Sequence, residues 1–528
     1  MYPRRLHCTG ADNLIVVLWL AGFLAACSSG GPSPAAVPPS PPPPSTTVNV
    51  AADNFDIRYT GRWNFDDPSA PWVAWQGSTV ELQFRGSAIQ IDIDVGAATE
   101  QFRVIVDGTA ATSVTSISPG RHLVVLETGL DDTNEHHIVL MKETYYSTAS
   151  TVYGFEINGE APTPLPIRPV HRIVYFGDSN MSGTSMYSEK DSGDEGSYYG
   201  YPAIVSRMLG AEMHLQAVGG ATLDGNQSNT VTSFIYAEQF GQANSQYRDN
   251  LDPQIIIVNA GANDIFGVPA ANRKDIVKQR YKNVIAELRN VYGTNAHIVL
   301  FNAYGWDPNE PANYTNEVVN ETGGNLSALL YPWTWEQYHG SMVEYGGQAR
   351  VLAEHIESLN LGLSVQQDAG IFDGLGRDFD VANGSFESIA KGGFNAFGWR
   401  YYDDGVERVC GTGEASDGDC FVRLNAGETV HQGIDATGDL LPGATSGGQQ
   451  YVVTATIRGN GIAGISADYE QQELYTRQNR EEQMFNVTTT WQDYSATFTA
   501  PDGTWTTYVS LRAESGDIEF DNIRMRSN

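Results

Sequence analysis

A serine that directly follows a buried strand is the first residue of this sequence that could do chemistry. In 173-IVYFGDSNMSG-183 an apolar run ends at Gly177, and Asp178 and Ser179 follow at once. Such a serine can cap the next helix, because its hydroxyl accepts a backbone N–H, or it can be a nucleophile if a base lies within hydrogen-bond reach. The segment alone leaves both interpretations open. It lacks the G-x-S-x-G nucleophile elbow of α/β-hydrolases, because Met181 stands where the second glycine is needed.

Two other predicted strand ends carry the N–H donors that ester hydrolysis requires. The tetrahedral intermediate of that reaction bears an oxyanion, which needs preorganised N–H groups about 3 Å away. One strand leads into the glycine pair of 213-MHLQAVGGATLDG-225, and another leads into Asn263 of 255-IIIVNAGAND-264. Together with the backbone N–H of Ser179, these groups could surround an oxyanion.

A candidate base stands near the end of the same region. His339 lies in 333-WTWEQYHGS-341, just before the last predicted helix, and Glu336 precedes it by three residues and could orient its ring. His355 lies within a helical run and His171 precedes the strand that leads to the serine. We interpret these two histidines as structural.

These four blocks, in this order, resemble the SGNH (GDSL-type) hydrolase family over most of residues 170–360. The resemblance implies these catalytic and oxyanion residues: nucleophile Ser179, base His339, and oxyanion donors Ser179, Gly220 and Asn263. Gly219 is the alternative to Gly220, because the glycine pair leaves the register open. Asp178 and Asp264 would shape the turns. The chain departs from the family at Glu336, where aspartate is usual, and at Gly340, where proline is usual.

The elements that must position these residues alternate between strands and helices. Buried-strand runs (173-IVYF, 255-IIIV, 298-IVLF) are separated by helical segments such as 274–293 and 343–359. This alternation predicts a parallel sheet covered by helices on both faces, with catalytic residues at the carboxyl ends of its strands. The resemblance implies an α/β/α SGNH domain of flavodoxin-like type.

Short alternating runs on both sides of this domain predict β-rich domains. Before it, 79-TVELQFRG-86, 89-IQIDIDVG-96 and 102-FRVIVDG-108 are typical of a β-sandwich or jelly roll. His136 and His137 are neighbours in this region, but adjacent strand residues face opposite sides, so we expect no shared metal. The runs after the central domain predict a second β-sandwich.

A β-sandwich directly before an SGNH domain is similar to carbohydrate esterase family 2, whose members remove O-acetyl groups from polysaccharides such as xylan and glucomannan. The joining segment 153–179 carries this resemblance. Aromatic residues on loops near the predicted site could stack on sugar rings; they are Tyr304, Trp306, Trp333 and Trp335. No cofactor is expected for catalysis.

The C-terminal region resembles carbohydrate-binding modules of families 4, 9 and 22, through 381-VANGSFES-388, Trp399 and 516-GDIEFDNIRM-525. Such modules often enclose a structural calcium ion, and the resemblance places Glu387 and Asp521 as its oxygen ligands.

The N-terminus predicts export. Arg4 and Arg5 precede an apolar run that ends in the sequence Leu-Ala-Ala-Cys at Cys27, which resembles the lipobox of bacterial lipoproteins. The resemblance implies cleavage before Cys27, lipid on its thiol, and a membrane-anchored protein in the periplasm or on the cell surface. Cys410 and Cys420, close together in an exported chain, are the economical pair for a disulfide.

The sequence therefore predicts a multidomain chain with these segments: signal peptide 1–26, Pro-rich linker 27–47, β-sandwich 48–163, SGNH domain 164–364, linker 365–378 and β-sandwich 379–528. A formal net charge of −32 makes nucleic acid an unsuitable partner. The predicted function is a serine esterase that deacetylates polysaccharide. The alternatives are a non-catalytic polysaccharide-binding lipoprotein and an SGNH lipase or thioesterase.

Overall fold

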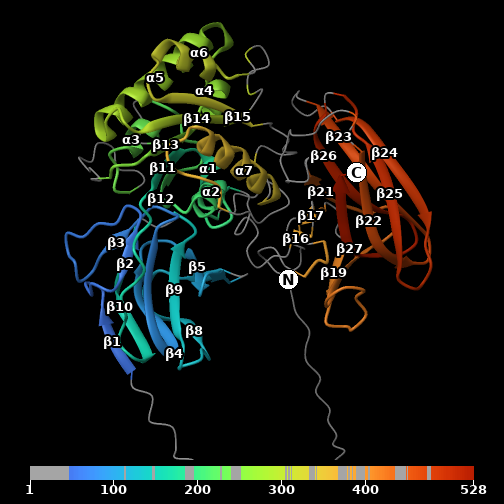
Figure 1. Cartoon of the computed structure of the whole chain (residues 1–528), viewed down its shortest axis with the longest axis horizontal. Helices are drawn as coiled ribbons and strands as arrows, with labels where there is room; N and C mark the ends of the chain where they lie inside the picture. Colours follow the sequence, from blue (N-terminus) through green and yellow to red (C-terminus); the bar gives the residue numbers. More distant parts are fainter. Residues whose placement is uncertain are drawn as a thin grey trace, which may run out of the picture. The chain divides into compact units, whose positions relative to one another are not determined.

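The structure, a computed structural model, falls into three successive regions between Thr47 and Ser527 (Figure 1). It describes residues 47–111, 114–145, 149–184, 196–225, 229–239, 251–303, 306, 310, 312–331, 339, 342–366, 377–378, 381–382, 384–387, 399–401, 405–434, 448, 450–471, 477–502 and 504–527. The predicted signal peptide, Cys27 and the Pro-rich linker lie outside the described residues. Within the described ranges, no helix is long and apolar enough to span a bilayer.

The first region, called here the N-terminal β domain, is built from antiparallel strands. Its longest strand, β4, alternates buried and half-buried side chains, and it joins two sheets because its first part pairs with β9 and its second part pairs with β8 and β10. Leu82, Phe84, Ile89 and Ile91 of β4 are completely buried. The strands of this domain are β1 (Thr47–Ala51), β2 (Arg58–Thr60), β3 (Trp72–Val73), β4 (Thr79–Val95), β5 (Glu100–Val106), β6 (Thr109–Ala110), β7 (Thr115–Ile117), β8 (Gly120–Thr128), β9 (Glu135–Lys142) and β10 (Ser150–Gly159).

The central domain contains a five-stranded parallel sheet with the order β12-β11-β13-β14-β15. The strands are β11 (Arg172–Gly177), β12 (Glu212–Ala217), β13 (Ile255–Asn259), β14 (His297–Ala303) and β15 (Leu326–Tyr331). Uninterrupted apolar runs such as 255-IIIV are buried along their whole length, as expected for parallel strands covered on both faces.

Helices connect these strands. The longest, α5, buries residues at helical spacing (Val277, Tyr281, Val284, Leu288), which gives it one apolar face for packing. The helices are α1 (Ser179–Ser182), α2 (Tyr201–Leu209), α3 (Val231–Phe234), α4 (Ala262–Gly267), η1 (Ala270–Asn272), α5 (Arg273–Tyr292), α6 (Thr315–Thr322) and α7 (Met342–Ser358).

The strand order fixes where a site can form. β11 lies between β12 and β13, and all three run parallel, so their carboxyl ends meet at one edge of the sheet. The chain passes from β11 to β12 on one side, and from β12 it returns to β13 on the other side of β11. Ligands of such folds bind at the point where the direction of the connections reverses. The segments after β11, β12 and β13 are those that carry Ser179, Gly220 and Asn263.

The C-terminal β domain contains two five-stranded antiparallel sheets, with the orders β18-β21-β26-β23-β24 and β19-β20-β27-β22-β25. Both sheets contribute completely buried side chains, among them Leu511 of β26 and Phe520 of β27. The strands of this domain are β16 (Arg377–Asp378), β17 (Val381–Ala382), β18 (Arg400–Tyr401), β19 (Glu407–Cys410), β20 (Cys420–Leu424), β21 (Thr429–Ile434), β22 (Gln450–Gly459), β23 (Ile462–Gln471), β24 (Arg477–Asn486), β25 (Gln492–Thr499), β26 (Thr504–Ser515) and β27 (Ile518–Ser527).

Candidate active site

Ser179 and His339 are hydrogen-bonded although 160 residues separate them. His339 Nε2 lies 2.8 Å from Ser179 Oγ, and both side chains are half-buried. Ser179 is the first residue of α1, and the helix cap is the preceding Asp178, whose carboxylate accepts the N–H of Asn180. The hydroxyl of Ser179 is therefore not the cap. A serine hydroxyl within hydrogen-bond reach of an imidazole is the arrangement of an activated nucleophile.

The loop after β12 places its two glycines in different roles. Gly219 donates its N–H to the Tyr145 hydroxyl at 2.9 Å, so that donor is already used. Gly220 is exposed and has a φ of +73°, a left-handed conformation that side chains with a Cβ rarely adopt. Among the described residues no group accepts the Gly220 N–H. Gly220 is thus the better oxyanion donor of the pair.

Asn263 lies at the same edge of the sheet, in the first turn of α4. Its amide donates to the carbonyl oxygen of Ala221 at 2.8 Å, which ties it to the loop that contains Gly220. A side-chain amide has two N–H donors. One can hold the Ala221 carbonyl while the second serves an oxyanion, beside the backbone N–H groups of Ser179 and Gly220.

Asp178 and Asp264 are both completely buried beneath this edge. Asp264 accepts the N–H of Leu223 and pairs with Arg280 at 2.6 Å, while burial raises its pKa. Burial, together with the charge of Asp264, raises the pKa of Asp178 to about 7. The Asp178 carboxylate contacts the turn after β11, and the Asp264 carboxylate contacts the loop after β12 and helix α5.

The other residues predicted for substrate handling are distributed differently. Glu336, Tyr304, Trp333 and Trp335 lie outside the described residues. Trp306 is only 2 % exposed, so its ring packs within the apolar core. Stacking on a sugar requires a free ring face, so the burial of Trp306 does not favour this role, which stays a prediction.

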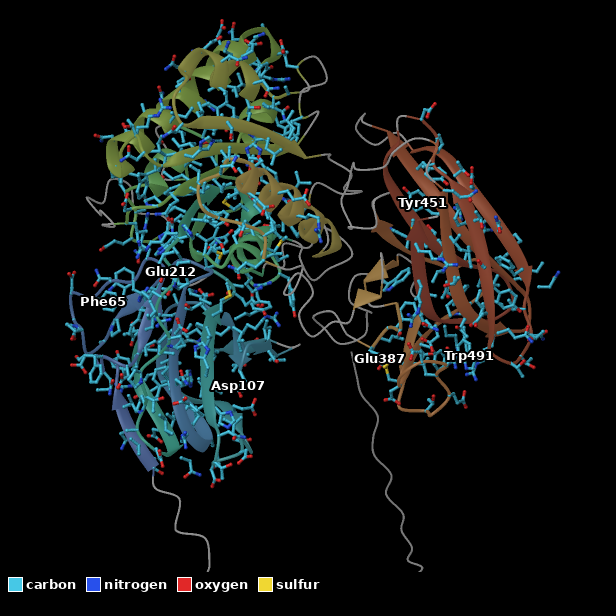
Figure 2. The ribbon with its side chains drawn as sticks, viewed as in Figure 1. Phe65, Asp107, Glu212, Glu387, Tyr451 and Trp491 are labelled. Atoms are coloured by element: carbon cyan, nitrogen blue, oxygen red, sulfur yellow. A yellow bond between two sulfur atoms is a disulfide. The ribbon has the colours of Figure 1, made fainter. Side chains whose placement is uncertain are left out.

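Three of the other histidines have structural partners. His136 bonds Asp107 at 2.8 Å and His137 bonds Glu81 at 2.7 Å, so the two neighbours use different carboxylates, as the alternation of a strand requires; Figure 2 labels Asp107 on the N-terminal β domain. His355 bonds Ser327 at 2.9 Å, and burial lowers its pKa.

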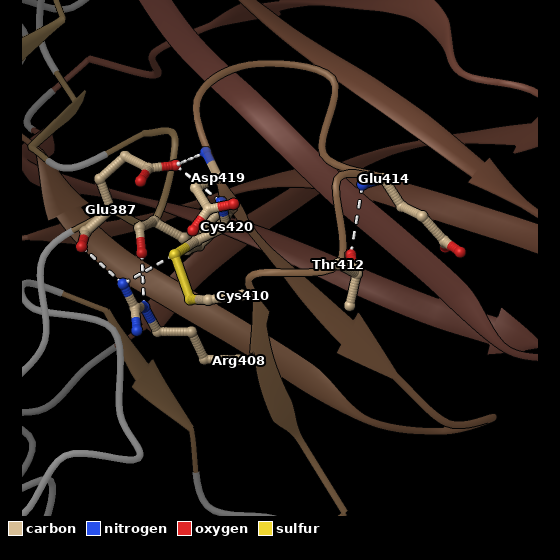
Figure 3. Close-up of a disulfide and its surroundings, with 8 residues drawn as sticks. Glu387, Arg408, Cys410, Thr412, Glu414, Asp419 and Cys420 are labelled. Atoms are coloured by element: carbon tan, nitrogen blue, oxygen red, sulfur yellow. Dashed lines mark hydrogen bonds between the residues drawn. A yellow bond between two sulfur atoms is a disulfide. The ribbon is translucent and has the colours of Figure 1, made fainter. Parts of the chain in front are cut away.

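The two carboxylates predicted to bind calcium hold a loop by its N–H groups. Cys410 and Cys420 form a disulfide that closes residues 411–419, and Glu387 Oε1 accepts the N–H groups of Asp419 and Cys420 at 2.8 Å each (Figure 3). Asp521 Oδ2 accepts three bonds from residues 416 and 417. Both carboxylates thus serve as hydrogen-bond acceptors for this loop, and calcium binding by Glu387 and Asp521 stays a prediction. Within the described ranges, no group of three or more His, Cys, Asp or Glu side chains could hold a metal ion.

Two residues that contact the site were absent from the predictions. Tyr145 comes from the N-terminal β domain, and Asn229 follows the glycine loop; both bond the backbone of Gly219. Neither belongs to a short motif. Only the proximity of Asn229 to the glycine pair in the sequence is a signal that could have drawn attention to it.

Comparisons with known proteins agree with this architecture. Residues 59–166 match the family described as carbohydrate esterase 2 N-terminal, and residues 175–339 match the GDSL-like lipase/acylhydrolase family. The cellulase/esterase CelE of Acetivibrio thermocellus is 31% identical over an alignment of 307 residues, and the match covers 55% of this chain and 36% of CelE. The chain thus spans about a third of the length of this curated relative.

Solved structures also match more than half of the chain. A family two carbohydrate esterase from Clostridium thermocellum, determined in complex with cellohexaose, is 27% identical with a TM-score of 0.53, and the match covers 58% of this chain and 99% of that one. A family two esterase from Cellvibrio japonicus has the same fold, with 18% identity and a TM-score of 0.52 over 60% of this chain and 98% of that one. The homologues are therefore carbohydrate esterases with a GDSL-like hydrolase domain.

Proposed function

We propose that this chain is a serine esterase that removes O-acetyl groups from polysaccharide. The observation that carries the proposal is the 2.8 Å contact between Ser179 Oγ and His339 Nε2, at the sheet edge where Gly220 and Asn263 offer N–H donors. The family-2 N-terminal match and the cellohexaose complex of a relative support a sugar polymer as the carrier of the ester.

The reaction follows from the roles of these groups. Ser179 Oγ attacks the acetyl carbonyl carbon while His339 Nε2 takes the hydroxyl proton. The carbonyl oxygen becomes an oxyanion, which the N–H groups of Ser179, Gly220 and Asn263 stabilise. The ester C–O bond then breaks, and His339 returns the proton to the departing sugar oxygen. Water, deprotonated by His339, attacks the acetyl-enzyme and releases acetate and free Ser179.

Glu336 is proposed as the residue that orients the His339 ring. A carboxylate at this place would fix the imidazole tautomer and stabilise the imidazolium that forms. If this is right, Glu336→Gln lowers kcat, while an unchanged kcat would leave a Ser-His dyad.

The experiment that tests the esterase proposal compares purified wild type, Ser179→Ala and His339→Ala on an aryl acetate. We expect activity in the wild type and its loss in both variants, with unchanged melting temperatures. Full activity in either variant would contradict the assignment. A series of aryl esters with longer acyl chains separates an acetylesterase from a lipase, because a preference for long chains would favour the latter.

Export and anchoring form a second part of the proposal. The lipobox-like end of the apolar run and the Pro-rich tract support a lipid on Cys27 and a spacer between membrane and enzyme. Metabolic labelling with a fatty acid should mark the wild type and leave Cys27→Ala unmarked. Equal labelling of both would contradict it.

A further inference from the structure

At the end of strand β9 the chain continues as a short segment in which every residue forms a hydrogen bond or an ion pair. We call residues 142–145 the strap. Lys142 pairs with Glu100 at 2.7 Å, the Thr144 hydroxyl donates to the same carboxylate, and the Lys142 ammonium also donates to the Thr144 carbonyl. Lys142 and Glu100 are at most 1 % exposed. Buried charges are costly unless they are paired, so these bonds hold the strap firmly in one place.

The next residue of the strap reaches the central domain. Glu143 pairs with Arg103 of the N-terminal β domain through one oxygen, at 2.5 Å. Its other oxygen accepts the backbone N–H groups of Ser197, at 2.5 Å, and Tyr198, at 2.8 Å. The Ser197 hydroxyl donates back to the Glu143 carbonyl at 3.0 Å. One fully buried carboxylate thus fastens the strap to the segment that precedes α2.

Tyr145 ends the strap at the glycine loop of the active site. Its hydroxyl accepts the N–H of Gly219 at 2.9 Å, and the amide of Asn229 donates to the carbonyl oxygen of Gly219 at 3.2 Å. The Gly219 carbonyl and the Gly220 N–H belong to one planar trans peptide unit and point in opposite directions. Asn229 therefore fixes the plane that contains the Gly220 N–H, and Tyr145 fixes the plane before it.

External clamps are needed at this point because the backbone itself supplies little restraint. Two successive glycines have the greatest conformational freedom of any dipeptide, so their peptide planes can rotate at small cost. An oxyanion donor is effective only when it is aimed before the reaction begins. A contact that stops this rotation acts on the transition state without touching the substrate.

We propose that Tyr145 is a positioning residue for the oxyanion hole, so that the N-terminal β domain takes part in setting the catalytic rate. The buried Lys142–Glu100 and Arg103–Glu143 pairs hold the strap in place, and Tyr145 at its end holds the N–H of Gly219. Asn229 holds the carbonyl oxygen of Gly219, so the two side chains together form a clamp on this residue. This inference rests on the proposed function, because it assumes that Gly220 serves an oxyanion generated at Ser179.

The test uses Tyr145→Phe in the full chain, since this change removes the accepting oxygen and keeps the ring. With an aryl acetate, kcat should fall about 10- to 100-fold while KM changes little, because a small misplacement of a catalytic group has an effect of this size. Phenylboronic acid, which forms a tetrahedral adduct with a nucleophilic serine, should bind more weakly by a similar factor. Tyr153→Phe is the matched control: Tyr153 lies on β10 of the same domain, with its ring 3.7 Å from the Arg121 guanidinium carbon, and its change should leave both values unaltered.

A second variant probes the clamp without altering the strap. Asn229→Ala should also lower kcat, and the double variant should lose less than the product of the two single losses, because both residues hold the same loop. The inference is overturned if folded Tyr145→Phe keeps kcat within about twofold of the wild type, or if only its KM rises, since positioning changes kcat. An unchanged kcat in Asn229→Ala also overturns it. If the wild type itself is inactive, or Ser179→Ala is active, the esterase proposal has failed instead.

Discussion

Asp178 stands next to the nucleophile and yet has no part in the reaction proposed here. One of its oxygens accepts the N–H of Asn180, and the other is buried with no hydrogen-bond partner among the described residues. Burial raises its pKa to about 7. The protonation of Asp178 therefore makes the free energy of unfolding depend on pH.

We expect Asp178→Asn to flatten the pH dependence of stability. Between the unfolded pKa of about 4 and the folded pKa of about 7, the folded state holds a proton that the unfolded state releases, so the free energy of unfolding falls by about 1.4 kcal/mol per pH unit as the pH rises. Asparagine carries no such proton. Melting temperatures at several pH values in this window should show the variant gaining relative to the wild type as the pH increases.

The exposed Asp66→Asn is the control for this comparison, since its side chain lies at the surface and, within the described ranges, bonds only Asn64. It should follow the wild-type pH profile. Parallel profiles for wild type and Asp178→Asn would contradict the argument.

A second prediction at the residue scale concerns Gly220. Its φ of +73° costs any residue with a Cβ about 1–2 kcal/mol, although among the described residues the only atom within 4 Å of a Cβ built there is the Asn229 amide nitrogen at 3.8 Å. Gly220→Ala should therefore lower stability modestly and lower kcat about tenfold or more by turning the oxyanion donor away. Gly129→Ala has a φ of +76° in an open turn of the N-terminal β domain, so it should show a similar stability loss and full activity. Equal activities in the two variants would show that Gly220 is not a donor.

Single residues were predictable where a motif places them directly after a strand. Ser179, the glycine pair and Asn263 each follow a buried run, and parallel strands bring such ends together whatever the rest of the chain does. Tyr145 was not predictable, because its position results from how one domain packs against another. The burial of Trp306 was not predictable either, since sequence does not distinguish an aromatic residue beside a cleft from one in the core.

At the scale of elements, the periodicity of apolar residues was sufficient to predict the strands of the central sheet and the long helices. The runs 173-IVYF, 255-IIIV and 298-IVLF are buried parallel strands, and α5 covers the predicted helical segment. The alternating run from residue 79 to 96, interpreted as separate short strands, is mostly one continuous strand, β4, which serves two sheets. The alternation of apolar and polar residues shows which face of the sheet a side chain lies on, but it does not show where a long strand changes the strands it pairs with.

The loop between β19 and β20 provides a prediction at this scale. Asp521 accepts N–H groups from residues 416, 417 and 522, so the carboxylate is satisfied without a cation. We expect excess EDTA to leave the melting of the C-terminal β domain unchanged, and Asp521→Ala to lower it, because buried N–H groups would lose their acceptor. Differential scanning calorimetry with and without added Ca²⁺ measures both effects. A melting temperature that falls with EDTA and recovers with Ca²⁺ would contradict this expectation and support calcium binding.

At the scale of the whole molecule, buried side chains of the N-terminal β domain bind the central domain. Arg62 donates to the carbonyl oxygens of Phe234 and Ala237, and Gln76 donates to that of Ala217 at the end of β12. These side chains are buried, so separation would leave polar groups unpaired. The match to the solved family two esterase covers 58% of this chain and 99% of that one.

The last prediction follows from that match. A chain that ends at residue 366 retains every described residue of the active site and the strap. It should therefore fold and hydrolyse an aryl acetate with kcat/KM within about twofold of the full chain, as expected for a separate domain whose removal leaves the site intact.

Acetate release from an insoluble acetylated polysaccharide should decrease in the shorter chain if the C-terminal β domain holds the enzyme on its substrate, because tethering raises the local concentration of ester. A soluble acetylated oligosaccharide is the control, and both chains should act on it equally. Equal release from the insoluble polymer would remove sugar binding from the role of this domain, whereas loss of activity on the aryl acetate would show that the catalytic unit extends beyond residue 366.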